Sequence, residues 1–304
     1  AWQESPDGAV TVVEARYVVR SRLQAGFAVT GFDPARALYV EVDLKSSRII
    51  SDLEKAITNR RIAVDRSGNV YLSGTVPDER HCRDDPGGFF APCTDGIVAA
   101  FRPDGQPIYR TILAGEAEEW IGPMALDSNA NIVIAGNTAS KEFPTTAGAV
   151  QPTNAGPIGP APRTHPVQHA IGDVFVSRIH PRTGDLLHSS FLGGPEAESP
   201  VALGIGEGDR ISILAAVFSS FPTTPGAWIR GLKSNGWALV QFESNLTRLR
   251  YSTFLPLVLS PSGIQMHAHA DGSVFCSGRT SASGAPTTPG ALQPSAGAGY
   301  ILRL

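Results

Sequence analysis

A four-residue motif occurs three times in this chain, and its repetition constrains the fold more than any other feature. The motif reads Phe-Pro-Thr-Thr or Ala-Pro-Thr-Thr, and its copies begin at Phe143, Phe221 and Ala285. Each copy continues within a few residues into a Gly-Ala pair. Repetition on this scale indicates an array of similar units that stack on one another and share a continuous core. We therefore expect function to lie on the surfaces that the array presents.

Two hairpin patterns recur with the motif in a fixed order. In the first, alternating apolar residues flank a turn of Asp, Gly and Asn, and its copies lie at 62–74, 124–136, 203–215 and 266–278. The second pattern has copies at 97–113, 174–192 and 237–255. Alternation on both sides of a turn predicts paired antiparallel strands. Four strands in each repeat are typical of a β-propeller blade.

The final repeat ends at Leu304 after its third strand, so one strand of the expected four is missing. Segment 38–50 is strand-like and could supply that strand, which would close the ring and hide both sheet edges. We therefore predict an all-β fold in which residues 37–304 form a β-propeller of four blade equivalents, the last closed by the N-terminal strand. Residues 1–36 do not follow the repeat and are expected to be a short β segment, the tail of a preceding β domain. If 38–50 does not pair beside Leu304, an open array becomes the better interpretation.

Composition narrows the class of protein. Charged residues make up 17% of the chain and the net charge is −3; nucleic-acid-binding proteins usually show a basic stripe, so we predict no nucleic-acid partner. The chain has no continuous apolar run long enough to cross a membrane, so no transmembrane segment is predicted. It begins at Ala1 without a signal peptide, and we expect a mature or excised portion of a longer secreted protein.

The three cysteines suggest two different roles. Cys82 and Cys93 flank a short loop rich in Pro, Gly and Asp. A disulfide that closes this loop is predicted for an oxidising compartment, the alternative being two unpaired surface thiols. Cys276 lies in an apolar strand and is expected to be an inert core residue.

His267 and His269 are candidates for chemistry because they alternate along one predicted strand and share a face. Two imidazoles there could bind a metal or place a base near a central channel. The alternative is a contact between blades, with both rings hydrogen-bonded. The same places in the first repeat hold Ala63 and Asp65, so the pair departs from its own repeat. Two ligands make an incomplete site, and no metal or cofactor is predicted.

Two further groups are candidate binding residues. His165 and His169 lie in the Gly- and Pro-rich insertion 154–171 and are interpreted as solvated loop residues. Three acids beside an aromatic ring form a possible sugar-binding patch, with a solvated acidic turn as the alternative. These residues are Glu116, Glu118, Glu119 and Trp120.

The turns at 65–69 and 127–131 faintly resemble calcium-binding loops. The full EF-hand pattern with its final Glu is absent, and Asp and Asn are ordinary turn residues. The sequence contains no Gly-x-Ser-x-Gly elbow, no P-loop and no dinucleotide fingerprint. Catalysis is therefore not predicted from motifs.

The repeat resembles that of the bacterial SBBP family of β-propeller repeat proteins, over about residues 10–304. Family-like blades combine a Tyr-Ser-Thr-Tyr-Leu-Gly-Gly strand, an Asp-x-x-Gly-Asn-Val-Tyr hairpin, a Phe-Pro-Thr-Thr-Pro-Gly-Ala connection and an Asp-Ala-Phe-Val strand. The matching segments here are 188–194, 251–255, 65–71, 221–227 and 173–176. The resemblance implies a secreted or cell-surface location and supplies no catalytic residues.

With this resemblance, the sequence favours a non-catalytic binding or assembly module of a bacterial envelope, with a protein or surface-glycan partner. We expect the Cys82–Cys93 loop and the insertion 154–171 to carry the specific contact, because they break the repeat. Two alternatives stay open. One is a propeller hydrolase or lyase acting on polysaccharide. The other is a structural subunit of a surface complex or filament, whose sheet edges pair with neighbours.

Overall fold

The structure is a computed structural model of the 304-residue chain. It describes residues 1–21, 24–39, 58–77, 94–156, 172–233, 235–256, 264–269, 271–279 and 300–304. The predicted disulfide pair, Cys82 and Cys93, and the loop histidines, His165 and His169, lie outside the described residues. The chain divides into two compact units, Ala1–Ile50 and Ser51–Leu304.

The first unit consists of short antiparallel strands in two sheets. The strands are β1 (Trp2–Glu4), β2 (Val10–Val12), β3 (Glu14–Ser21), β4 (Gln24–Thr30) and β5 (Leu38–Tyr39). β1 lies between β2 and β5, and β3 pairs with β4. The Trp2 and Tyr39 rings stack with 4.2 Å between their centroids, which fastens β5 to β1.

This pairing bears on the predicted closing strand. Leu38 and Tyr39, the first two residues of segment 38–50, pair with Gln3 and Trp2 in the first unit rather than with the strand that ends at Arg303. Residues 40–57 lie outside the described part of the chain. Closure of a ring therefore stays a prediction.

The second unit contains four antiparallel sheets, each a run of strands that pair in sequence order. Sheet I has β6 (Thr58–Val64), β7 (Val70–Pro77), β8 (Thr94–Phe101) and β9 (Pro107–Leu113), and sheet II has β10 (Glu119–Leu126), β11 (Ile132–Thr138), β12 (Asp173–Ile179) and β13 (Leu186–Leu192). Sheet III has β14 (Ser199–Ile205), β15 (Ile211–Val217), β16 (Gly236–Phe242) and β17 (Leu249–Leu255), and sheet IV has β18 (Gln265–Ala268), β19 (Val274–Gly278) and β20 (Tyr300–Arg303). The predicted all-β class and its four-stranded antiparallel sheets are confirmed.

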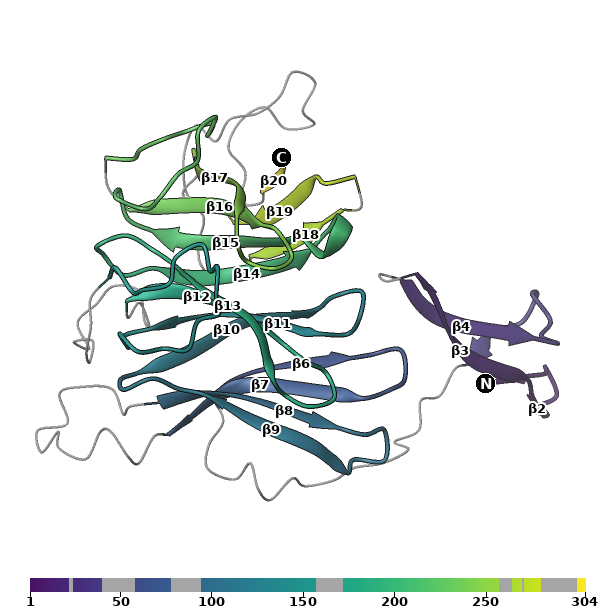
Figure 1. The fold of residues 1–304 in the computed structure, drawn as a ribbon. Helices are drawn as coiled ribbons and strands as arrows, with labels where there is room; N and C mark the ends of the chain where they lie inside the picture. Colours follow the sequence, from purple (N-terminus) through teal and green to yellow (C-terminus); the bar gives the residue numbers. More distant parts are fainter. Residues whose placement is uncertain are drawn as a thin grey trace, which may run out of the picture. The chain divides into compact units, whose positions relative to one another are not determined.

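The four sheets stack face to face in sequence order (Figure 1). Their first strands are neighbours, because β10 contacts β6, β14 contacts β10 and β18 contacts β14. Alternating apolar side chains meet between successive sheets, as Tyr71 of sheet I does with Ile132 of sheet II, and Leu239 of sheet III with Cys276 of sheet IV. Burial of these faces is the main favourable contribution to the fold.

The Asp-x-x-x-Asn turn between the first two strands is explained by its hydrogen bonds. In sheet I, Asp65 Oδ1 accepts from the main-chain N of Ser67 (2.8 Å) and of Asn69 (2.9 Å), and Asp65 Oδ2 accepts from Asn69 Nδ2 (2.8 Å). In sheet II, Asp127 accepts the same three bonds from Asn129 and Asn131. Because donors within each turn occupy the carboxylate oxygens, Asp65 and Asp127 are explained as turn-forming residues. The resemblance of these turns to calcium loops therefore needs no ion.

The Phe-Pro-Thr-Thr motif leaves the second strand of a sheet and covers the outer edge of its fourth strand. Thr146 N donates to Ser189 O on β13 (3.0 Å), and Ser189 N donates to Thr146 Oγ1 (2.9 Å). In sheet III, Thr224 and Ser252 of β17 make the same two bonds. The motif thus satisfies backbone groups on a strand edge that would otherwise be open to pairing with another chain.

The aromatic residue of the motif anchors this connection in the core. Phe143 is buried, and its ring lies 4.3 Å from that of Phe175 between centroids. Phe221 is also buried, at 6.5 Å from Phe254. The third copy of the motif, from Ala285, lies outside the described residues.

Candidate functional site

The predicted histidine pair lies at the end of sheet IV. His267 is on β18, and His269 follows the end of that strand, with 6.4 Å between the ring centroids. His269 Nδ1 lies 3.0 Å from Asp271 Oδ1 and accepts a hydrogen bond from Asp271 N. His269 therefore occupies the turn position that Asp65 holds in sheet I. Within the described residues, no group of three His, Cys, Asp or Glu side chains is close enough to hold a metal ion.

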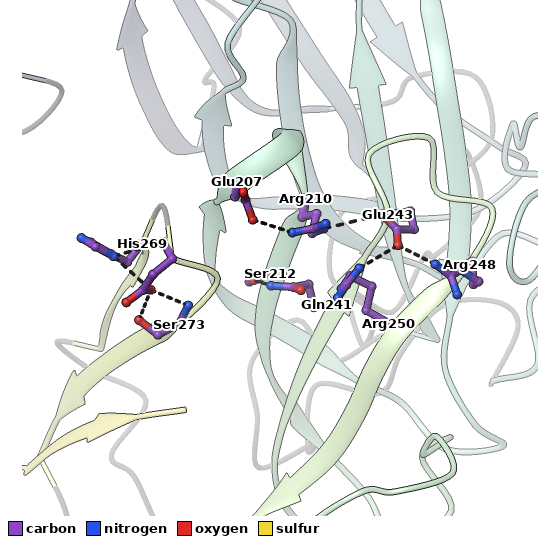
Figure 2. A network of polar contacts seen from close by, with 10 residues as sticks. Glu207, Arg210, Ser212, Gln241, Glu243, Arg248, Arg250, His269 and Ser273 are labelled. Carbon is purple, nitrogen blue, oxygen red and sulfur yellow. Dashed lines mark hydrogen bonds and ion pairs between the residues drawn. The ribbon is translucent and has the colours of Figure 1, made fainter.

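The turn around His269 has further polar partners (Figure 2). Asp271 accepts hydrogen bonds from the N and Oγ of Ser273 and from Arg303 Nη2. The bonds from Ser273, followed by that from His269, lower the pKa of the exposed Asp271 carboxyl. Arg303 also lies over the Phe275 ring, 5.4 Å from its centroid. These contacts stabilise the turn that follows β18.

A second exposed charge network surrounds Glu243, after β16 (Figure 2). Arg248 Nη2 and Arg250 Nη1 lie 2.8 and 3.2 Å from Glu243 Oε1, and Arg210 Nε lies 3.7 Å from Oε2. Burial would raise the pKa of Glu243, but the two hydrogen-bonded arginines lower it. Arg210 also pairs with Glu207 at 3.1 Å. Exposed pairs of this kind contribute little stability each.

The acids predicted to form a sugar-binding patch do not share a surface. Glu116 is exposed, and its carboxylate accepts hydrogen bonds from the main-chain N of Lys141 and Glu142. Glu118 and Glu119 are buried, and Trp120 is half-buried on β10. Of the three carboxylates, only that of Glu116 is presented to solvent.

Two pairs of buried acids join successive sheets. Asp95 and Glu119 lie at the junction of sheets I and II, and Asp173 and Glu198 at the junction of sheets II and III. Asp173 and Glu198 are fully buried, and both have an oxygen, Oδ1 and Oε2 respectively, without a hydrogen-bond partner in the described part of the chain. We did not single out these acids from the sequence. Their signal is an Asp at the third strand and a Glu beside the next first strand, which recur together in two repeats.

The outer faces of the two end sheets carry exposed apolar side chains. On β6, Ile62 and Val64 are 68% and 56% exposed, on the face opposite Tyr71 and the core shared with sheet II. On β20, Ile301 is 76% exposed, while the next residue, Leu302, packs toward sheet III. The outer faces of sheets I and IV thus keep apolar side chains in contact with solvent.

Comparison with protein-family models and with curated proteins finds no match for this sequence. Among the described residues, no helix is long and apolar enough to span a membrane.

Proposed function

We propose that this chain is a non-catalytic assembly module that binds a neighbouring protein through the outer faces of its end sheets. The observation that carries this proposal is the exposure of Ile62, Val64 and Ile301 on faces that point away from the stack. Inside the stack, the same kind of face is covered by the next sheet. An outer sheet face with exposed apolar residues has the composition that is typical of a protein–protein interface.

The occupant that fits best is a second copy of the chain. Sheet IV of one copy placed on sheet I of the next would repeat the face-to-face packing that joins sheets I to IV. Such a contact is heterologous, since it joins two different surfaces, and it can extend into longer assemblies. β20 adds to this fit, because it holds the third-strand position and, among the described residues, pairs only with β19.

The resemblance to SBBP repeats supports a place in the bacterial envelope or outside the cell for this module. The polysaccharide hydrolase or lyase alternative has no comparable support. Its candidate residues lie apart, with His267 and His269 on sheet IV and Glu116 at the entry to sheet II. The Glu116 carboxylate accepts two main-chain hydrogen bonds, and His269 Nδ1 accepts one from Asp271 N.

Sedimentation velocity over a range of concentrations tests the proposal. We expect the unmodified chain to associate, and Ile62→Lys or Ile301→Lys to abolish association, since either change blocks one of the two surfaces. Mixing the two variants should restore dimers, because each retains the surface that the other lacks. Trp228→Lys is the matched control, since Trp228 is 55% exposed outside both end faces.

A chain that stays monomeric at every concentration would reject the second copy as occupant. Association that neither lysine variant changes would reject these faces as the contact. Circular dichroism of each variant confirms that the fold is intact before its association is judged.

A further inference from the structure

The carboxyl groups of Asp173 and Glu198 meet at one backbone position. A Cβ built on Gly193 would collide with both Asp173 Oδ1 and Glu198 Oε2, so the two oxygens converge on the same glycine. Both are the oxygens that lack a hydrogen-bond partner. The other oxygens are occupied: Asp173 Oδ2 accepts from Gln151 Nε2 and Ala155 N, and Glu198 Oε1 accepts from Gly194 N.

The equivalent acid at the preceding junction has a different environment. Glu119 Oε1 accepts hydrogen bonds from the hydroxyls of Thr138 and Ser140, and Oε2 accepts from Gly115 N at 3.0 Å. These donors favour the ionised form of Glu119, although burial raises its pKa to about 7. At the next junction Val217 takes the place of Thr138, so Glu198 has no such hydroxyl beside it.

Two buried oxygens that converge on one position without a hydrogen-bond donor of their own are costly, because a desolvated acceptor loses its water and gains nothing in return. A single hydrogen atom between them satisfies both. We propose that Asp173 and Glu198 share one proton at neutral pH, with Glu198 Oε2 donating to Asp173 Oδ1, and so link sheet II to the start of sheet III.

The charges around Asp173 and Glu198 favour the state in which the two side chains share one proton. Burial, followed by the negative charges of Asp173 and Glu196, raises the pKa of Glu198 to about 9. Burial raises the pKa of Asp173 to about 6, against the lowering effect of Ala155 N, the Gln151 side chain and the main chain of Gly156. Asp173 on β12 and Glu196 in the loop before β14 are the charged groups that act on Glu198 within the described residues, and both are acidic.

The expected pH dependence has a definite sign. In the unfolded chain Glu198 loses its proton above about pH 4.3, whereas in the folded protein the shared proton is retained. The folded state therefore binds more protons, and stability falls as the pH rises from about 5 toward 9. Below pH 4 the contribution of this pair is fully present.

Isosteric variants test the proposal. Glu198→Gln keeps a permanent donor opposite Asp173 Oδ1, and Asp173→Asn places a donor opposite Glu198 Oε2. We expect each to reduce proton release on unfolding at pH 7 by about one proton, read from the pH dependence of the unfolding constant. The melting temperature of Glu198→Gln should rise relative to that of the parent chain as the pH increases.

Glu119→Gln is the matched control, because it replaces one accepting oxygen by an NH2 group and leaves at least one of the three donors without its acceptor. It should lower the melting temperature at pH 9. Carbon-13 carboxyl NMR of the parent chain needs no variant: one glutamate resonance should stay protonated up to pH 8, above the range in which Glu118 and Glu119, whose pKa values burial raises to about 7, lose their protons. Unchanged proton release in Glu198→Gln, or full ionisation of every glutamate at pH 7, would overturn the proposal. So would a rise in melting temperature with calcium chloride that Glu198→Gln abolishes, since the pair would then hold a cation.

Discussion

Arg178 on β12 and Asp127 in the turn after β10 form a buried ion pair, with Nη1 of the arginine 3.3 Å from Oδ2 of the aspartate. The same guanidinium donates from Nη2 to the main-chain oxygen of Asp209, in the corresponding turn of sheet III (2.9 Å). The Asp209 carboxylate in turn accepts from the N and Oγ of Ser128. One arginine therefore fixes a turn of its own sheet and connects it to the next sheet.

Replacing this arginine should destabilise the protein more than replacing any exposed one. Arg178→Met leaves the buried Asp127 carboxylate without a cation, and we expect a loss of about 3 kcal/mol in the free energy of unfolding. Urea titration followed by tryptophan fluorescence measures it. Arg248→Met is the control, since Arg248 is 69% exposed in its pair with Glu243 and should change stability by less than about 1 kcal/mol. Equal losses in the free energy of unfolding of the two variants would show that the buried ion pair contributes no more stability than the exposed one.

The edge cover made by the Phe-Pro-Thr-Thr motif can be tested with one hydroxyl. Thr146→Val preserves shape but removes the oxygen that accepts from Ser189 N at 2.9 Å. We expect a loss of about 1–2 kcal/mol, because a backbone donor on β13 is left without its partner. Thr145→Val makes the same change one residue earlier, at an exposed bond to Pro152 O of 3.3 Å. A larger loss at Thr145 than at Thr146 would contradict the structural role given to the motif.

The turn carboxylate of Asp65 predicts an effect of acid. Burial would raise the pKa of Asp65, but the hydrogen bonds from Asn69 and Tyr71 lower it below its ordinary value. Its stabilising contribution is therefore present above about pH 4 and is lost as the pH falls through the lowered pKa. Asp65→Asn should reduce the melting temperature at pH 7, and the reduction should shrink between about pH 4 and 2. Asp104→Asn changes a carboxylate that accepts one main-chain hydrogen bond in the β8–β9 turn and should have the smaller effect. A difference that persists unchanged at pH 2 would reject this account.

Thiol labelling separates the three cysteines. Cys276 is buried between sheets III and IV, and burial raises the pKa of its thiol to about 12. In the folded, oxidised protein we expect no labelling by iodoacetamide, since the reactive thiolate is scarce and covered. Unfolding without a reductant should expose only Cys276, because the predicted disulfide holds Cys82 and Cys93. Three labels by mass spectrometry under those conditions would show that the disulfide is absent.

Much of the fold could be predicted because its signals are local. Alternation in β7 and β11, and the turns at Asp65 and Asp127, specify hairpins without reference to the rest of the chain. The role of Thr146 could not be predicted in this way, because its partner, Ser189, lies on a strand beyond the next connection. Proline and glycine in the motif predict an extended connection and do not identify the edge that it covers.

The histidine pair and the buried acids show the same limit. Alternation predicts that His267 and His269 share a face, but β18 ends at Ala268, and His269 enters a turn as a substitute for Asp65. Asp173 and Glu198 stand in segments that read as turn-flanking acids, and only the packing of sheet II on sheet III makes them buried. Burial of a charged residue depends on which sheets meet, and that information is spread over the whole repeat.

The motif covers the edge of the sheet to which it belongs, so a repeat that carries it, as sheets II and III do, brings its own protection against strand pairing. A repeat of this kind can be gained or lost without creating a new adhesive edge in its neighbours. The number of sheets in such a chain is thereby free to change in evolution.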